Sequence, residues 1–198
     1  MDTLIEGIDA SVQPCTLAVV LPAVATVFAS GRRALVGWLG FVLGCSILFW
    51  ARAAGYWDVS RSGVMQLVVA ALAVAAFGAV YLRRRGDIDL TFGGAVVAGG
   101  LAGWLWRPCV GERLGDILNN ASDEGVRTLS LTPLYVTGVT IVGLGLALVP
   151  RVWPRVLPVV ERRGLRLVGL YFAVAYAALI AAGRYDDLVA ELLQRSSA

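Results

Sequence analysis

The 198-residue sequence contains no histidine, no lysine and no C-x-x-C motif, and only 16% of its residues are charged. The absence of histidine excludes haem ligation by imidazole, most zinc sites and acid–base catalysis by histidine. Without a C-x-x-C motif, an internal disulfide has to join distant positions among the three cysteines. The net charge of +3 is spread over several loops, unlike a nucleic-acid-binding patch. We therefore expect no metal, no cofactor and no nucleic-acid partner.

Apolar residues are in large excess, at 58% of the chain with a mean hydropathy of +0.75. A soluble domain is roughly half apolar and about a quarter charged. The excess lies in uncharged runs that are each close to the ~20 residues needed to cross a ~30 Å hydrocarbon core. The six runs are Ala10–Gly31, Ala34–Ala51, Ser62–Leu82, Leu90–Trp106, Thr128–Pro150 and Leu167–Gly183. They predict an all-α membrane protein with six transmembrane helices, in which residues 1–198 form a single transmembrane domain.

The arginines are unevenly distributed between alternate loops. The loops after the first, third and fifth runs hold ten of the 17 basic residues but only three of the 14 acidic ones. Because positive charge is enriched in cytoplasmic loops, these loops are predicted to be cytoplasmic and both termini extracytoplasmic. The N-terminus holds Asp2, Glu6 and Asp9, whereas a cleaved signal peptide begins with basic residues, so we do not expect one.

Two Pro-Cys pairs, Pro14-Cys15 and Pro108-Cys109, lie in the first run and directly after the fourth. Proline removes a backbone donor and clashes with the preceding turn, and it is well tolerated only at the first helical position. Each pair is thus predicted to end one half-helix and begin another, with the thiol in the first turn of the second. Unpaired amides and the helix dipole at that position favour the thiolate, which is the reactive form of cysteine. We interpret Cys15 and Cys109 as a redox pair that the fold brings together.

Charged residues lie close to the second pair. Arg107 could favour the thiolate of Cys109, whereas Glu112 would oppose it, and Asp116 adds a further carboxylate. Charged residues at membrane depth are candidates for a functional role. Two interpretations remain open: these residues tune the site, or they lie at the outer membrane interface, where charge is tolerated.

The remaining notable residues are interpreted mainly as packing residues. Cys45 sits in the middle of a run with no proline or charge nearby, which is typical of a small buried hydrophobe. Trp104 and Trp106 are expected to be interfacial or packing aromatics. The fourth run is rich in glycines, which let helix backbones approach closely in lipid; the alternative is that they let the helix bend or slide. These glycines are Gly93, Gly94, Gly99, Gly100 and Gly103.

The two halves of the chain have the same plan. Residues 1 to about 86 and about 87 to 198 each begin with a Pro-Cys helix and hold three runs, so the halves would enter the membrane from opposite faces. This predicts two inverted three-helix repeats with the first and fourth helices broken, a plan found in many transporters. The helix after Cys15 is expected to contain Pro22 and to run to Ser30, followed by a tight turn at Gly31–Arg33.

The segments QPCTLAVVLP and RPCVGERLGDIL resemble the paired motifs of the CcdA family, which is similar to the transmembrane domain of DsbD. The resemblance covers essentially the whole chain. It implies that Cys15 and Cys109 are the redox pair. It further implies helix-breaking roles or motif positions for Pro14, Pro108, Pro22, Gly111 and Gly115. The chain departs from the family pattern at Ala18 and Glu112, where the family usually has proline, and at Asp116, where it has small apolar residues.

The resemblance implies a membrane thiol–disulfide oxidoreductase of the bacterial plasma membrane. Such proteins pass reducing equivalents from cytoplasmic thioredoxin to extracytoplasmic thioredoxin-like proteins, for cytochrome c maturation or disulfide reduction. Two alternatives remain. One is a solute or metal transporter on the same plan, and the other is a structural subunit of a membrane complex that has lost the chemistry.

Overall fold

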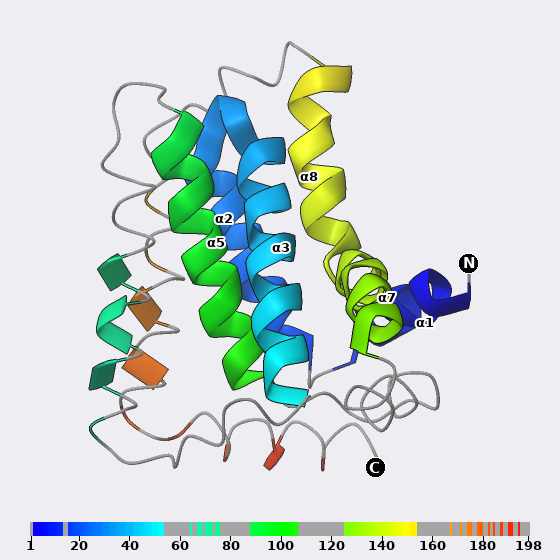
Figure 1. The fold of residues 1–198 in the computed structure, drawn as a ribbon. Helices are drawn as coiled ribbons and strands as arrows, with labels where there is room; N and C mark the ends of the chain where they lie inside the picture. The colour runs from blue at the N-terminus through cyan, green and yellow to red at the C-terminus, as the bar shows by residue number, and fades with distance from the viewer. Residues whose placement is uncertain are drawn as a thin grey trace.

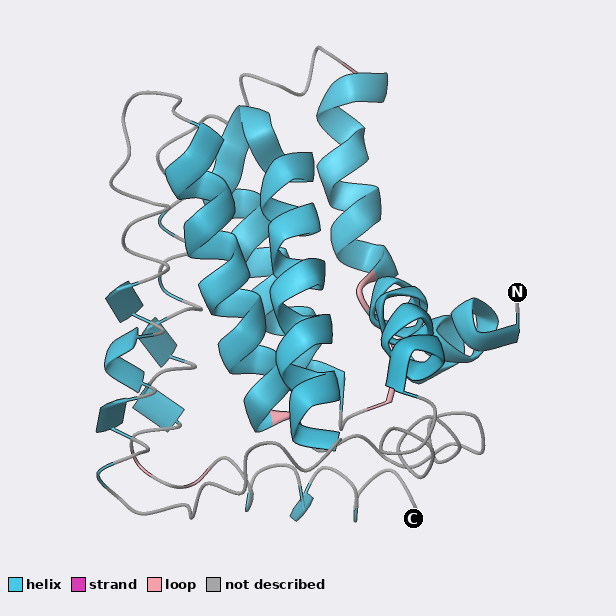
Figure 2. Ribbon diagram, in the orientation of Figure 1, coloured by secondary structure: helices cyan, strands magenta, loops and turns pink. Residues whose placement is uncertain are grey.

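The computed structural model describes residues 2–13, 16–53, 88–106 and 125–153, together with single positions between 64 and 75 and between 167 and 194. Within these ranges the regular elements are helices and none is a strand (Figure 2), which confirms the expected all-α class. The bundle is built around α2, α3 and α5, with α8 beside them and α7 and α1 at one side (Figure 1).

The N-terminal part of the chain forms two helices and a hairpin turn close to the predicted boundaries. Helix α1 spans Asp2–Ala10 and α2 spans Leu17–Ser30. The 3₁₀ turn η2, Gly31–Arg33, leads into α3, Ala34–Ala53. Gly31 has a φ of 56°, which favours glycine and explains why α2 ends there. As a result, α2 and α3 lie side by side and are connected by η2 (Figure 1).

Helix α5, Ile88–Leu105, packs along α3 through glycines on both helices. A Cβ atom at Gly44 would overlap the carbonyl oxygen of Val96, and one at Gly103 would overlap that of Cys45. A Cβ atom at Gly99 would lie 2.7 Å from the carbonyl carbon of Phe41. The α3 and α5 backbones are therefore in direct contact, as in membrane helix pairs built on small residues. This confirms the packing interpretation for Gly99 and Gly103.

The fifth run is not one straight helix. Helix α7, Gly125–Val139, and helix α8, Ile141–Val152, meet at Thr140, and the segments Ser130–Val139 and Ile141–Val149 differ in direction by 69°. The bend does not occur at Pro133, which lies inside α7. Thr140 has non-helical dihedral angles, φ −95° and ψ 20°. The indole Nε1 of Trp38 on α3 donates to the Thr140 carbonyl oxygen at 3.3 Å and to its Oγ1 at 3.2 Å, which stabilises the bend.

We expect Trp38→Phe to lower the unfolding free energy by about 1–2 kcal/mol, because the buried oxygens of Thr140 lose the indole N–H that donates to them. Combined with Thr140→Val in a double-mutant cycle, the two changes should be coupled by about 1 kcal/mol. Unfolding measured in detergent micelles tests this, and Trp153→Phe, at an exposed tryptophan, is the control. If the losses of unfolding free energy from Trp38→Phe and Thr140→Val are strictly additive, α3 is not energetically linked to the bend.

One helical run, Val19–Ala51, is 33 residues long and apolar enough to cross a membrane. Gly31 divides this run between α2 and α3. The bent pair formed by α7 and α8 passes the same criterion only when its two parts are taken together. The third and sixth expected spans, Ser62–Leu82 and Leu167–Gly183, lie largely outside the described residues. In the described part of the chain, one helical run, or two if the bent pair is counted, is long and apolar enough to cross a membrane.

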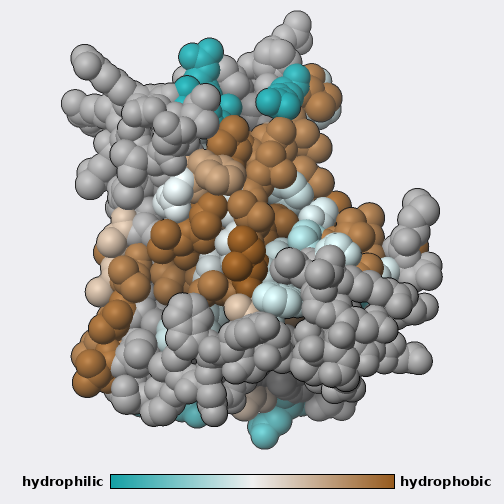
Figure 3. Space-filling model, viewed as in Figure 1, coloured by the Kyte–Doolittle hydropathy of each residue, from teal (hydrophilic) through white to brown (hydrophobic). Residues whose placement is uncertain are grey.

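The described bundle exposes aliphatic side chains on its surface and buries several hydroxyl groups among its apolar core residues. On α3, the side chains of Leu39, Leu43 and Ile47 form an exposed aliphatic stripe. Hydroxyl groups are instead buried: Thr26 donates to the Pro22 carbonyl oxygen and Ser46 to that of Val42, each at 2.7 Å. A band of apolar residues lies between hydrophilic ends (Figure 3). Such a surface suits a hydrocarbon environment.

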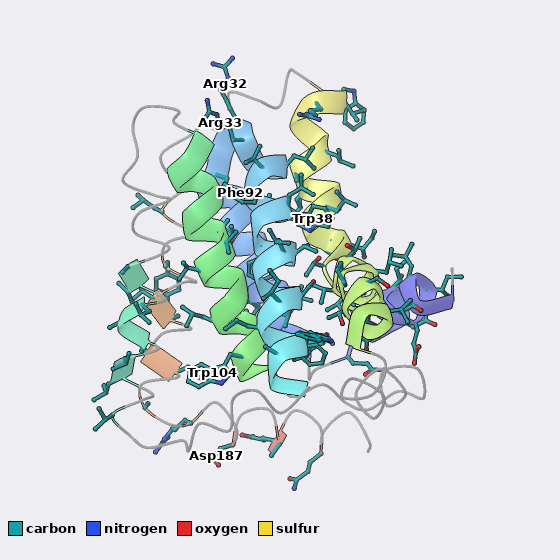
Figure 4. The ribbon with its side chains drawn as sticks, in the orientation of Figure 1. Arg32, Arg33, Trp38, Phe92, Trp104 and Asp187 are labelled. Atoms are coloured by element: carbon teal, nitrogen blue, oxygen red, sulfur yellow. The ribbon has the colours of Figure 1, made fainter. Side chains whose placement is uncertain are left out.

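Three described arginines lie at one end of the bundle. Arg32 and Arg33 in η2 lie at one end, where α8 also ends with Arg151 in its last turn. Asp187 lies toward the opposite end (Figure 4). The described arginines of the predicted cytoplasmic loops therefore share one face of the molecule.

Candidate functional site

The residues predicted to form the redox site fall almost entirely outside the described part of the chain. This holds for both cysteines, both helix-breaking prolines, the glycines of the second motif and the charged cluster. They are Pro14, Cys15, Arg107, Pro108, Cys109, Gly111, Glu112, Gly115 and Asp116. Pro22 is described, and it lies buried inside α2. The structure does describe the helices and side chains that border the two motifs.

The first motif is bordered by the end of α1 and the start of α2. Helix α1 ends at Ala10 and α2 begins at Leu17, so the expected interruption of the first run is present. Thr16 is only 1% exposed, and its Oγ1 lies 2.7 Å from the Gln13 carbonyl oxygen and 2.9 Å from that of Ala10. Its backbone amide donates to the same Gln13 oxygen at 3.1 Å. Carbonyls at the end of a helix lack intrahelical partners, and Thr16 supplies one.

The second motif is preceded by Trp106, the residue after the last residue of α5. Its side chain is 0% exposed. The indole lies between Phe49 of α3, with ring centroids 4.9 Å apart, and Tyr135 of α7, with centroids 6.0 Å apart. Trp106 is thus a packing residue, in agreement with the expectation of an interfacial or packing aromatic. Helix α5 ends at Leu105, as the predicted interruption near Pro108 requires.

Tyr135 of α7 contacts both α1, which borders the first motif, and Trp106, which borders the second. Helix α1 crosses α7 at a glycine pair: a Cβ atom at Gly7 would overlap the carbonyl oxygen of Tyr135, and one at Gly138 would lie 2.8 Å from the Cα of Gly7. The other side of Tyr135 faces the indole of Trp106. The buried core accordingly includes Ala10 at the end of α1, Val19 in the first turn of α2, and Trp106. The chain segments bordering both Pro-Cys pairs belong to one core.

A carboxylate on α1 lies close to this core. Glu6, one residue before the glycine crossing on α1, interacts electrostatically with Tyr135. The described residues hold no group of three or more His, Cys, Asp or Glu side chains that could bind a metal ion. The described cysteine, Cys45, is a free thiol, and it is buried in the core against α5. Its interpretation as a packing residue is confirmed.

Sequence reasoning missed three residues that shape the borders of the site: Gly7, Thr16 and Tyr135. Gly7 is one glycine in a short acidic segment, and its partner is more than a hundred positions away, so no local pattern marks it. Thr16 had a partial signal: a threonine directly after Pro-Cys suggests a helix start, and Thr16 does precede α2, but its hydroxyl donates to the Ala10 and Gln13 carbonyl oxygens and does not cap α2. Tyr135 has no signal beyond being an aromatic residue in an apolar run.

The chain was compared with models of protein families, with curated proteins and with solved structures, and no match was found. What the arrangement can do chemically therefore has to follow from its own residues. The end of α1, the start of α2 and the residue after α5 contribute to one apolar core.

Proposed function

We propose that the protein is a six-span membrane thiol–disulfide oxidoreductase. In this proposal Cys15 and Cys109 form a redox pair that accepts reducing equivalents from cytoplasmic thioredoxin and passes them to a thioredoxin-like protein outside. The observation that carries the proposal is the shared core, to which the segments that border both Pro-Cys pairs contribute Ala10, Val19 and Trp106.

The packing of the described helices supports the inverted-repeat plan. Helix α5, which precedes the second Pro-Cys pair, packs on α3 of the first half. Helix α1, which precedes the first pair, packs on α7 of the second half. In each half, the helix that precedes the Pro-Cys pair therefore packs on a helix of the other half. Both of these contacts are made through glycines. The position of Arg32, Arg33 and Arg151 at one end of the bundle supports the cytoplasmic assignment of that end.

The proposed reaction consists of two thiol–disulfide exchanges. A thiolate of reduced thioredoxin attacks the Cys15–Cys109 disulfide, forming a mixed disulfide and releasing one of the two cysteines. The second thioredoxin thiol then displaces the bound cysteine, so thioredoxin leaves oxidised and the pair becomes a dithiol. The same two steps in the opposite sense reduce a disulfide outside. Two electrons and two protons pass from one protein dithiol to another, and no bound cofactor is required.

Thiol trapping in isolated membranes tests the proposal. Samples are quenched with acid and alkylated with a maleimide that adds measurable mass to each free thiol. The wild-type chain should gain one adduct after oxidation, through Cys45 under denaturing conditions, and three adducts after reduction by thioredoxin. Cys15→Ser should trap a mixed disulfide through Cys109, or Cys109→Ser one through Cys15.

Cys45→Ala provides the matched control, because it removes the remaining cysteine and should leave the disulfide and the mixed disulfides unchanged. If Cys15 and Cys109 keep the same state under all redox conditions, the proposal is wrong. Transport that survives Cys15→Ser would favour a solute or metal transporter. A stable partner that co-purifies without thiol changes would favour a structural subunit.

A further inference from the structure

Arg33, the last residue of η2, has a partly buried side chain whose Nη1 atom is buried. Within the described part of the chain, this nitrogen has no hydrogen-bond partner. A guanidinium group stays charged in proteins, and a buried charged donor is costly unless an acceptor pairs with it. The η2 end of the bundle therefore holds a buried cationic donor for which the described residues supply no acceptor.

The chemistry of this donor favours phosphate as its acceptor. The planar N–H groups of a guanidinium can bind two oxygens of one phosphate group at once, which a point charge cannot do. Arg32 is exposed directly beside Arg33 in the same turn, and Arg151 adds positive charge at the same end of the bundle (Figures 1 and 4). An anion at Nη1 would thus be held by a buried hydrogen bond and by the charge around it.

The apolar residues near this end indicate that the phosphate belongs to a lipid. Trp153, directly after α8, is 68% exposed, and exposed tryptophans are typical of the headgroup level of a bilayer. On α3, the exposed aliphatic stripe of Leu39, Leu43 and Ile47 begins roughly 9 Å along the helix from its start. A charged end above an exposed aliphatic surface matches the two parts of one lipid, its headgroup and its acyl chains.

We propose that Arg33 binds the phosphate group of an anionic lipid, with Arg32 adding charge to the site. The guanidinium donates hydrogen bonds to the phosphate oxygens, and no covalent bond is made or broken. The predicted cytoplasmic position of this end agrees with the proposal, because anionic lipids give the cytoplasmic leaflet its negative surface potential. This inference depends on the membrane location of the chain and not on the redox role of Cys15 and Cys109.

Native mass spectrometry of the purified full chain in detergent tests the site. The probes are dioleoylphosphatidylglycerol and dioleoylglycerol, which have the same acyl chains but differ in the phosphate headgroup. The wild-type chain should bind the phospholipid about tenfold more tightly, the effect of one charge-assisted hydrogen-bonded contact. Arg33→Gln should remove most of this preference. Arg33→Lys should keep only part of it, because an ammonium group lacks the planar fork.

Arg151→Gln is the matched control, because it removes the same charge from an exposed position at the same end. It should weaken phospholipid binding by about twofold or less. Equal losses in Arg33→Gln and Arg151→Gln would mean a general attraction to positive charge, and would overturn the inference. Displacement of the phospholipid by inorganic phosphate at constant ionic strength would overturn the assignment to a lipid.

Thermal unfolding in detergent separates binding from a purely structural role of Arg33. Without lipid, Arg33→Gln should be at least as stable as the wild type, because it removes a buried charge. Added dioleoylphosphatidylglycerol should stabilise the wild type more than this variant. An equal loss of stability with and without the lipid would contradict the proposal. If Arg33→Gln does not fold, Arg33→Lys decides by the same comparison.

Discussion

Replacing Trp106 with alanine is expected to lower the unfolding free energy by about 3–5 kcal/mol, the range for removing a large buried aromatic side chain. The indole fills the space between Phe49 and Tyr135, with ring centroids 4.9 and 6.0 Å away, and it is fully buried. Its loss would leave a cavity where α3, α5 and α7 meet. The aromatic contacts add to the cost, because offset and tilted ring pairs contribute beyond their buried area.

The measurement is unfolding in mixed detergent micelles, followed by circular dichroism. Trp153→Ala is the matched control: Trp153 follows α8 and is 68% exposed, so its replacement should change the stability by less than about 0.5 kcal/mol. Trp106→Phe should fall between the two, because phenylalanine fills part of the space. Equal stabilities of the two alanine variants would mean that Trp106 does not join the three helices.

Replacing Gly99 with alanine is expected to lower the unfolding free energy by about 3 kcal/mol, at the upper end of the range for overpacking. The added Cβ would overlap the Phe41 carbonyl oxygen and lie 2.7 Å from its carbonyl carbon and 2.8 Å from its Cα. These are backbone atoms of α3, which cannot turn away as a flexible side chain can. Relief therefore requires the two helices to move apart, which weakens every contact along their length.

Gly93→Ala is the matched control on the same helix, because no atom lies within 4 Å of a Cβ built there. It should be neutral or stabilise the chain by up to about 1 kcal/mol, since alanine favours helix over glycine. Thermal unfolding of both variants in the same detergent gives the comparison. If Gly99→Ala is as stable as Gly93→Ala, close backbone contact does not hold α3 against α5.

The helix ends could be predicted from the sequence where local chemistry sets them. Gly31 ends α2 because a left-handed backbone suits glycine, and the turn at Gly31–Arg33 was placed correctly. The interruption between α1 and α2 follows from Pro14, and the end of α5 at Leu105 agrees with a break near Pro108. Each of these depends on one residue and its immediate neighbours.

The bend between α7 and α8 could not be predicted in this way. Proline at 133 is the local signal for a break, yet α7 continues through it and the change of direction comes at Thr140. The residue that stabilises the bend is Trp38, which is 102 positions away in sequence. The aromatic contacts of Trp106 and the glycine contact of Gly7 have the same origin in tertiary packing, so a single sequence carries no marker of them. The redox pair itself remains a prediction.

The crossing of α1 over α7 has a mechanical consequence. Where Gly7 meets Gly138 there is no side chain between the two main chains, with a Cβ at Gly138 reaching to 2.5 Å from the Leu4 carbonyl oxygen. Because backbone atoms of the two helices are in direct contact at this crossing, a shift of one helix should move the other with it. A displacement of α7 would therefore be passed to α1 and to its end at Ala10, whose carbonyl oxygen is bonded to Thr16.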